Sequence, residues 1–283
     1  MNVELAEERV LFHPDRFNMD HAEGRAWSKR LEAFGTLAKM SSFLNKPRDE
    51  DFELVYRERR YQPYWHVCCA ATYAYERRRA YEVPVAPEVR SVFIEGRDHQ
   101  AANGRLTLEG LETCREEMRR EALFDGVSKA MDSSLHGYLR YDSQIVPADE
   151  AAGFAPEGVI VVPPQAKASM LLRDVLAGVI NRIDADRVLE ETVRVEAIDL
   201  YYRPVYAFRY RWQGKEAVIE FDALTGEARP GGATFEQYLG KVLEPKFLLD
   251  VGAETIDIFI PGANLAKLVI EKAVQASAAR KAQ

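Results

Sequence analysis

The sequence lacks the features by which several common classes of protein are recognised. It contains three cysteines in 283 residues, and Cys68 and Cys69 are adjacent. This odd number does not fit a disulfide framework and indicates a reducing cytoplasm. The apolar runs are far too short to cross a bilayer, and no early window predicts a secretory signal. Acidic residues outnumber basic residues by 45 to 38, which argues against non-specific nucleic-acid binding as the main role.

The sequence also lacks motifs that hold phosphate groups or metal ions. It has no Walker-type or dinucleotide-binding glycine pattern, and no acidic loop has calcium-loop spacing. Neighbouring carboxylates such as Glu190 and Glu191 point in different directions, as solvated surface residues do. We therefore expect no cofactor and no phosphate-cradling catalysis.

A repeated strand signature is the most informative feature that is present. Tyr61-Gln-Pro-Tyr-Trp-His-Val67 has a counterpart in Tyr202-Arg-Pro-Val-Tyr-Ala-Phe208. Both copies follow an acidic stretch and lead into basic and aromatic residues, although a gapless alignment of the surrounding segments contains only three identities. The repeat predicts two related modules.

Hydrophobic periodicity predicts the elements of the first half. We expect a helix over residues 21–44, bent or broken at Gly35, and strands over residues 52–94. Two helices should follow, one over residues 107–118 with Thr107 as its N-cap and one over residues 127–141.

Prolines and glycines between residues 145 and 164 predict a linker and divide the chain. The second half should contain an amphipathic helix near residues 172–183 and a hairpin turning at Gln213-Gly214. A strand over residues 251–260 and a closing helix over residues 265–273 should complete it. The expected divisions are an N-terminal arm and helix (1–44), a first module (45–145), the linker (146–164) and a second module with a C-terminal helix (165–283).

Residues 198–230 resemble the C-terminal half of a PepSY-type domain. The resemblance rests on Pro204-Val-Tyr-Ala-Phe208 and on Val218-Ile-Glu-Phe-Asp222-Ala-Leu-Thr225-Gly226-Glu227. In this turn Asp222 and Thr225 can bond the backbone, and Gly226 supplies a positive φ. The resemblance implies a cystatin-like helix on antiparallel strands and a binding or inhibitory role, which in that family is often extracytoplasmic. The first module resembles the family only weakly, because no residues after Ile94 were found to repeat the turn. We therefore predict an α+β fold with two helix-on-antiparallel-sheet modules of cystatin-like character.

His66 and Cys68 form the closest pair of metal-type ligands and share one face of a predicted strand. A zinc site would need further ligands, such as Cys114, His99 or His136, from elsewhere in the fold. A thiol nucleophile would need a base and an orienting group. A metal- or thiol-dependent hydrolase centred on His66 and Cys68 is therefore an alternative hypothesis. The simpler interpretation is that the cysteines are buried packing residues and the histidine is hydrogen-bonded.

Arginine and tyrosine alternate in both modules, as they do at protein interfaces and in single-strand nucleic-acid binders. The leading hypothesis is a non-catalytic cytoplasmic binding or assembly protein, such as an accessory subunit. It would dock a protein partner or another copy of itself through these residues, and a single-stranded nucleic-acid binder is the second alternative. The candidate binding residues are Arg59, Arg60, Tyr61, Tyr64, Arg77, Arg78, Arg79, Tyr202, Arg203, Tyr206, Arg209, Arg211 and Trp212.

Overall fold

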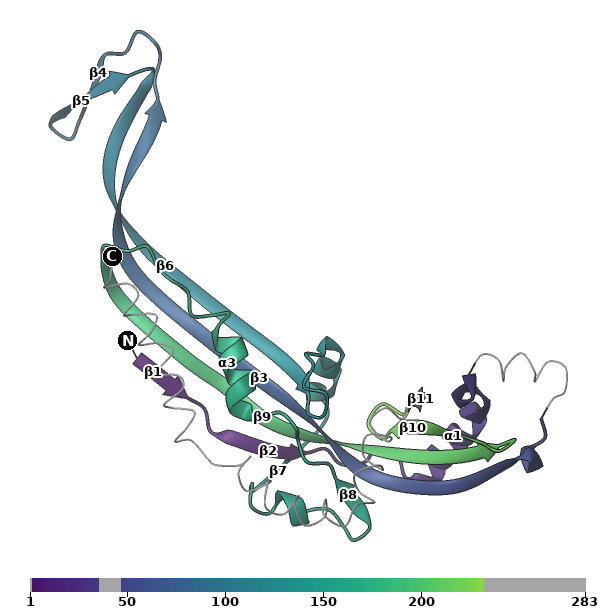
Figure 1. Cartoon of the computed structure of the whole chain (residues 1–283). Helices are drawn as coiled ribbons and strands as arrows, with labels where there is room; N and C mark the ends of the chain where they lie inside the picture. The colour runs from purple at the N-terminus through teal and green to yellow at the C-terminus, as the bar shows by residue number, and fades with distance from the viewer. Residues whose placement is uncertain (1, 36–46, 232–283) are drawn as a thin grey trace.

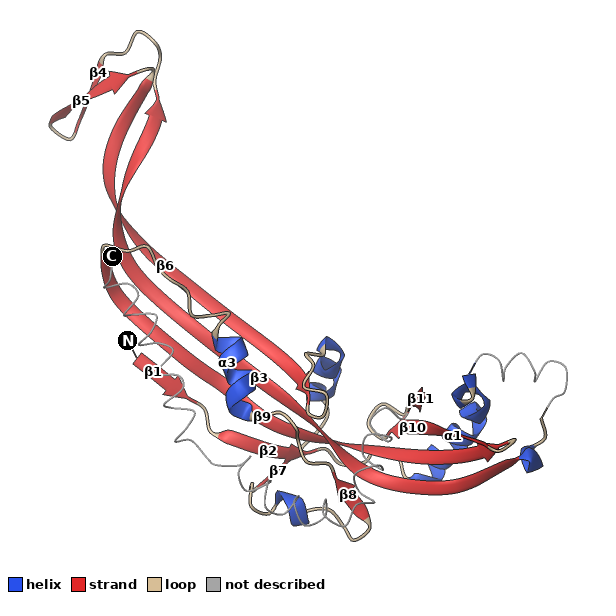
Figure 2. Ribbon diagram, viewed as in Figure 1, coloured by secondary structure: helices blue, strands red, loops and turns tan. Residues whose placement is uncertain are grey.

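The structure is a computed structural model that describes residues 2–35 and 47–231. A long curved sheet runs through the described part of the protein (Figures 1 and 2). Three strands form its centre: β3 (Phe52–Pro84), β6 (Arg105–Asp125) and β9 (Arg187–Trp212). At about 3.3 Å per residue the longest of them, β3, extends for roughly 100 Å along its curved path. The sheet therefore has the length of an elongated protein rather than that of two small modules.

Shorter elements line this sheet. The helices α1 (Met19–Ala33) and α3 (Ala168–Leu176) pack on it, and three 3₁₀ helices, η1 (Asp49–Asp51), η2 (Ser133–Arg140) and η3 (Ala151–Gly153), lie in its connections. The remaining strands are β1 (Asn2–Leu5), β2 (Glu8–Phe12), β4 (Ser91–Ile94), β5 (Arg97–Ala102), β7 (Gln144–Val146), β8 (Val159–Val161), β10 (Lys215–Asp222) and β11 (Ala228–Gly231).

The predicted pair of helix-on-sheet modules is wrong. β3 and β9, one from each expected module, pair antiparallel from Phe52 opposite Trp212 to Glu76 opposite Arg187. This shared ladder makes one large sheet out of both halves. The predicted linker also contributes to it, because β8 pairs with β3 and β7 pairs with β2.

The helix expected over residues 107–118 is instead part of strand β6. This segment is rich in Glu and Arg, which favour helices. However, the whole of β6 pairs with β3, from Asp125 opposite Tyr64 to Arg105 opposite Pro84. Tertiary pairing thus overrides local propensity. The helix expected over residues 127–141 is reduced to a turn and η2.

Two hydrophobic clusters hold the helices against the sheet. Ala22 and Ala26 of α1 pack on aromatic residues of β9 and β10, among them Phe208 and Phe221. The buried face of α3 belongs to a second cluster, with Trp65, Val67, Cys69, Leu172, Val175 and Leu176 among its members. The predicted helix periodicity of α3 is confirmed, although the α-helix itself ends at Leu176.

The two copies of the repeated signature lie side by side at the centre of the sheet. Tyr61 pairs with Pro204, and Pro63 pairs with Tyr202. The carbonyl of Pro63 accepts from Gly126 N at 3.0 Å, and that of Pro204 accepts from Ala223 N at 3.0 Å. At these prolines the strand that pairs with the other edge of each central strand changes. On β3 the edge away from β9 pairs first with β8 and then with β6, and on β9 the edge away from β3 pairs first with β2 and then with β10. Each proline therefore occupies a place where the ladder needs no N–H group.

The turn that ends β10 also has a counterpart after β6. Asp222 Oδ1 accepts from the backbone N–H groups of Leu224 and Thr225 at 2.9 and 3.0 Å. Asp125 Oδ1 likewise accepts from Val127 N and Ser128 N at 3.0 and 2.7 Å. The predicted bonds of Asp222 and Thr225 and the positive φ of Gly226 are confirmed. The first half does not repeat the Asp-Ala-x-Thr-Gly sequence after Ile94, but Asp125-Gly-Val-Ser-Lys129 forms an equivalent turn.

The backbone hydrogen bonds of the two copies also match in the segments that precede α1 and α3. His13 N donates to Tyr202 O at 2.9 Å, and Val162 N donates to Tyr61 O at 3.0 Å. Arg16 N donates to Ala223 O, and Gln165 N donates to Gly126 O. The helix of each copy then packs beside the central strand of the other copy: α1 contacts β9 and β10, and α3 contacts β3 and β6. The two copies are interlocked, because the helix of each packs on strands of the other.

Candidate functional site

Several of the candidate binding residues belong to the interior. Tyr61, Tyr64, Tyr202, Tyr206 and Trp212 are buried, as is Arg60. The ring of Trp212 stacks on Phe52 with 5.4 Å between centroids. These residues stabilise the sheet, and their side chains do not form an open docking surface.

The other candidate arginines are engaged with carboxylates of the same chain, with one exception. Arg78 is exposed, and its backbone N–H donates to Asp186. The ion pairs are Arg59 with Asp15, Arg77 with Glu112, Arg79 with Asp184, Arg203 with Asp222, Arg209 with Glu216, and Arg211 with Glu53 and Glu216. Because their charge is largely neutralised internally, these side chains provide no basic track for a nucleic-acid backbone.

A chain of charged groups crosses four strands around His66. Arg9 donates two hydrogen bonds of 2.7 Å to the buried carboxylate of Asp199. His66 lies between Asp199, 3.4 Å from Nδ1, and Glu121, 2.8 Å from Nε2. The network thus joins β2, β9, β3 and β6 in that order.

Electrostatics favour the charged form of every member of this network. Burial lowers the pKa of His66, but its hydrogen bonds to Asp199 and Glu121 outweigh burial and raise that pKa above its usual value. Burial raises the pKa of Asp199 and of Glu121, and bonds from His66 together with Arg9 or Arg119 overcome it, so both pKa values are lowered. An imidazolium held by two carboxylates ties strands together and is not a free base.

Cys68 is not arranged for catalysis. Burial, reinforced by a 3.3 Å hydrogen bond to Glu196, raises its pKa to about 12, so at neutral pH it is a protonated thiol rather than a nucleophile. Of the other proposed ligands, His99 lies on β5 and Cys114 on β6, while His136 lies on η2. Across residues 2–35 and 47–231, no three His, Cys, Asp or Glu side chains are grouped to hold a metal ion. The geometry gives the hydrolase hypothesis no support.

Replacing His66 by glutamine is expected to remove a pH-dependent part of the stability. Because the folded pKa is raised, the imidazolium stabilises fully below the unfolded pKa of about 6.5, and this contribution disappears as pH rises through the folded value. Urea unfolding at about pH 5 should show a loss on the order of 1–3 kcal/mol for His66→Gln and a smaller loss at about pH 9. The control is His99→Gln, and equal losses for His66→Gln at both pH values would contradict the assignment.

An arm (residues 77–112) extends beyond the body of the sheet, with β3 and β6 as its two-stranded stem and β4 and β5 at its end (Figure 1). β9 pairs with β3 only as far as Glu76, so in the described chain β3 continues from Arg77 with β6 alone beside it. Two tight turns, Glu95-Gly96 and Asn103-Gly104, form the tip, and all four residues have positive φ. A two-stranded ribbon is at best marginally stable in water by itself.

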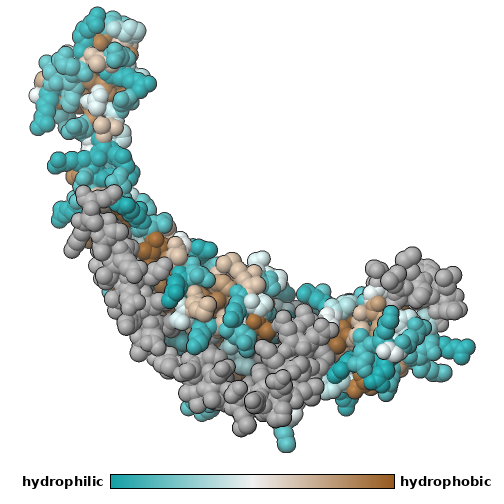
Figure 3. All heavy atoms as spheres, in the orientation of Figure 1, coloured by the Kyte–Doolittle hydropathy of each residue, from teal (hydrophilic) through white to brown (hydrophobic). Residues whose placement is uncertain are grey.

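The arm exposes large apolar side chains. Phe93 at the tip is 71% exposed and Leu111 is 61% exposed. Tyr81 and Val83 share one face of β3, as alternate residues do, and are 46% and 40% exposed. Figure 3 shows apolar atoms among the hydrophilic ones at this end. The candidate binding residues predicted from the sequence include only arginines from the arm, because the pattern of a strand does not show how many neighbouring strands it will have.

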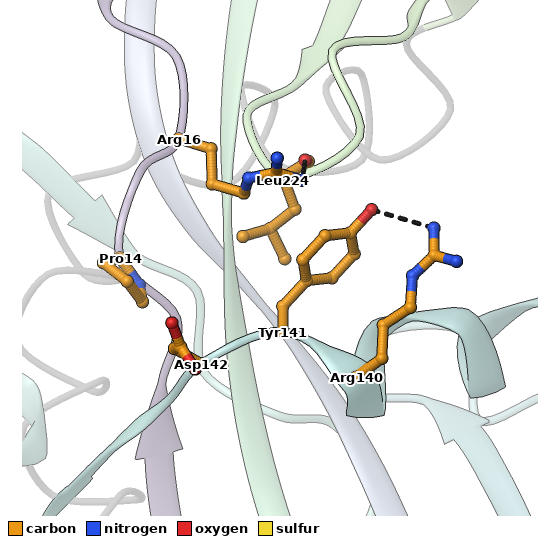
Figure 4. A pocket seen from close by; sticks show the side chains of 6 residues that line it. All are labelled: Pro14, Arg16, Arg140, Tyr141, Asp142 and Leu224. Carbon is orange, nitrogen blue, oxygen red and sulfur yellow. Dashed lines mark hydrogen bonds between the residues drawn. The ribbon is translucent and has the colours of Figure 1, made fainter.

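A separate pocket of about 420 Å³ lies beside the turn that ends β10 (Figure 4). Its walls come from the segment after β2, the segment around the end of η2 and the Asp222 turn. It is lined by Pro14, Arg16, Arg140, Tyr141, Asp142 and Leu224. Sequence reasoning missed this site, because its residues are dispersed over three distant segments.

Comparison with family models, curated proteins and solved structures found no match to this chain. Among residues 2–35 and 47–231, no helix has both the length and the apolar character needed to cross a bilayer.

Proposed function

We propose that this chain is a non-catalytic, cytoplasmic protein-binding or accessory assembly protein that contacts its partner through the arm. The observation that carries the proposal is the arm of residues 77–112. In the described chain β3 has only β6 beside it there, and the arm exposes Phe93, Leu111, Tyr81 and Val83. Burying such groups at an interface is favourable at roughly 25 cal/mol per Å².

The arm also provides backbone groups for a partner strand. Up to Glu76 one edge of β3 pairs with β9. After Glu76 this edge has no partner strand among the described residues. Such an edge accepts an added strand through main-chain hydrogen bonds, while neighbouring side chains supply specificity. Three free cysteines, two of them buried, support the proposed reducing compartment.

A triple variant tests the arm. Tyr81→Ser, Val83→Ser and Phe93→Ser together should abolish stoichiometric recovery of the partner when the full chain is purified from its native host. The body of the sheet should remain folded, because these residues lie outside the two main clusters. Ile145→Ser is the matched control, since Ile145 is 60% exposed and lies on β7 outside the arm.

Two measurements complete that experiment. Circular dichroism of the variants establishes that the sheet is retained, and light scattering of the wild-type chain over a concentration series tests whether the partner is a second copy. Recovery of the same partner at the same ratio by the triple variant would overturn the role of the arm. Turnover of a small molecule by the wild-type chain alone would overturn the proposal that the protein is non-catalytic.

A further inference from the structure

The pocket beside the Asp222 turn contains two arginines that the rest of the fold leaves available. Arg16 Nη1 donates to Leu224 O at 3.1 Å, and Arg140 Nη2 donates to the hydroxyl of Tyr141 at 3.1 Å. Each guanidinium has five N–H groups, so each retains donors for a further acceptor. Among the described residues neither has a carboxylate within ion-pair distance, whereas the neighbouring Arg203 is paired with Asp222.

The tyrosine between them orients both cations. The Cζ atoms of Arg16 and Arg140 both lie 5.1 Å from the centroid of the Tyr141 ring. These cation–π contacts hold the guanidinium groups at the pocket without neutralising them. Figure 4 shows the two side chains approaching Tyr141 from different segments of the chain.

The backbone around the pocket is firmly held. Arg16 N donates to Ala223 O at 3.0 Å, so the segment after β2 is tied to the turn. His13 Nδ1 lies 2.8 Å from Asp142 O, and its Nε2 lies 2.8 Å from the hydroxyl of Tyr64. Burial lowers the pKa of His13, which keeps this buried link neutral at physiological pH.

We propose that this pocket binds a compact oxyanion, the shared chemistry of phosphate and carboxylate groups. Two guanidinium groups on different segments suit such a ligand, because charge-assisted N–H···O bonds are the strongest that a side chain can donate. The exposed Pro14 also lines the pocket beside them. Asp142 also lines the pocket, and its carboxylate limits the affinity by repulsion. This site uses different residues from the arm, so the two proposals stand or fail separately.

Calorimetric titration of the full chain tests the site with inorganic phosphate at low salt. We expect saturable binding that weakens about tenfold in Arg16→Gln and in Arg140→Gln, which is ~1.4 kcal/mol for each. Asp142→Asn should bind more tightly, because the repulsion is removed. Arg25→Gln is the matched control, since Arg25 is an exposed arginine of α1 outside the pocket, and it should bind as the wild type does.

Two further ligands identify the source of the oxyanion. Titration with acetate and with phosphoserine separates a carboxylate site from a phosphoryl site, and binding of either one supports the proposal. If a glutamine variant fails to fold, Arg16→Lys and Arg140→Lys retain the charge and should weaken binding two- to fivefold through loss of the planar donor pair. Absence of saturable binding by all three anions, or binding that the Arg16 and Arg140 variants leave unchanged, would overturn the proposal.

Discussion

Replacing Arg60 by alanine should lower the free energy of unfolding by about 3–5 kcal/mol. Arg60 is 1% exposed and pairs with Glu58 at 2.6 Å and with Glu220. Its loss would leave two carboxylates without their cation in a largely dry site. Equilibrium urea unfolding of the full chain measures the effect.

Two further variants show whether charge burial is the cause. Replacing the whole cluster, with Glu58→Gln, Arg60→Met and Glu220→Gln, should cost less than Arg60→Ala alone, because no charge then remains unpaired. Arg57→Ala on the same strand removes an exposed pair with Glu23 and should cost less than about 1 kcal/mol. A similar small loss for Arg60→Ala would show that solvent reaches this cluster.

The second large effect on stability is expected at the Asp222 turn, and the equivalent Asp125 turn provides a comparison within the same chain. Asp222→Ala should destabilise by about 3–4 kcal/mol, because the carboxylate bonds the turn and also accepts from Arg203 at 2.8 Å and from Tyr138. Asp125→Ala removes only the equivalent turn bonds and should cost about 1 kcal/mol. Thermal unfolding of the two variants under the same conditions measures the difference.

Asp222→Asn separates the two roles of that carboxylate. The amide oxygen can still accept from Leu224 N and Thr225 N, while the charge opposite Arg203 is lost. We expect this variant to fall between Asp222→Ala and the wild type. Equal losses for Asp125→Ala and Asp222→Ala would mean that the ion pair with Arg203 contributes nothing measurable.

Local chemistry predicted the second hairpin well. Gln213 and Gly214 both adopt positive φ, and Lys215 pairs with Trp212, as the two-residue turn required. The bonds of the Asp222 turn were predicted for the same reason. Each depends on residues within a few positions of one another. The strand and helix expected over residues 251–273 lie outside the described residues.

The counterpart of that turn was missed because its glycines are placed differently. Lys129, with φ of 65°, stands where the second copy has Gly226. Gly126 stands where the second copy has Ala223, and a Cβ at Gly126 would lie 2.7 Å from Pro63 O. The remaining signal, an aspartate followed three residues later by serine or threonine, is too short to detect without the paired strands.

By itself, the sequence determined the Gln213-Gly214 hairpin turn, the Asp222 turn, the apolar face of α3 and the relation between the two Tyr-x-Pro segments, because these depend on short-range spacing and stereochemistry. The tertiary structure alone decided that the Glu- and Arg-rich residues of β6 are a strand, that α1 and α3 are exchanged between the copies, and that Arg16 and Arg140 meet at one pocket. The physical reason is that strand partners and burial depend on contacts between residues far apart in the chain, and local propensity is weaker than those contacts.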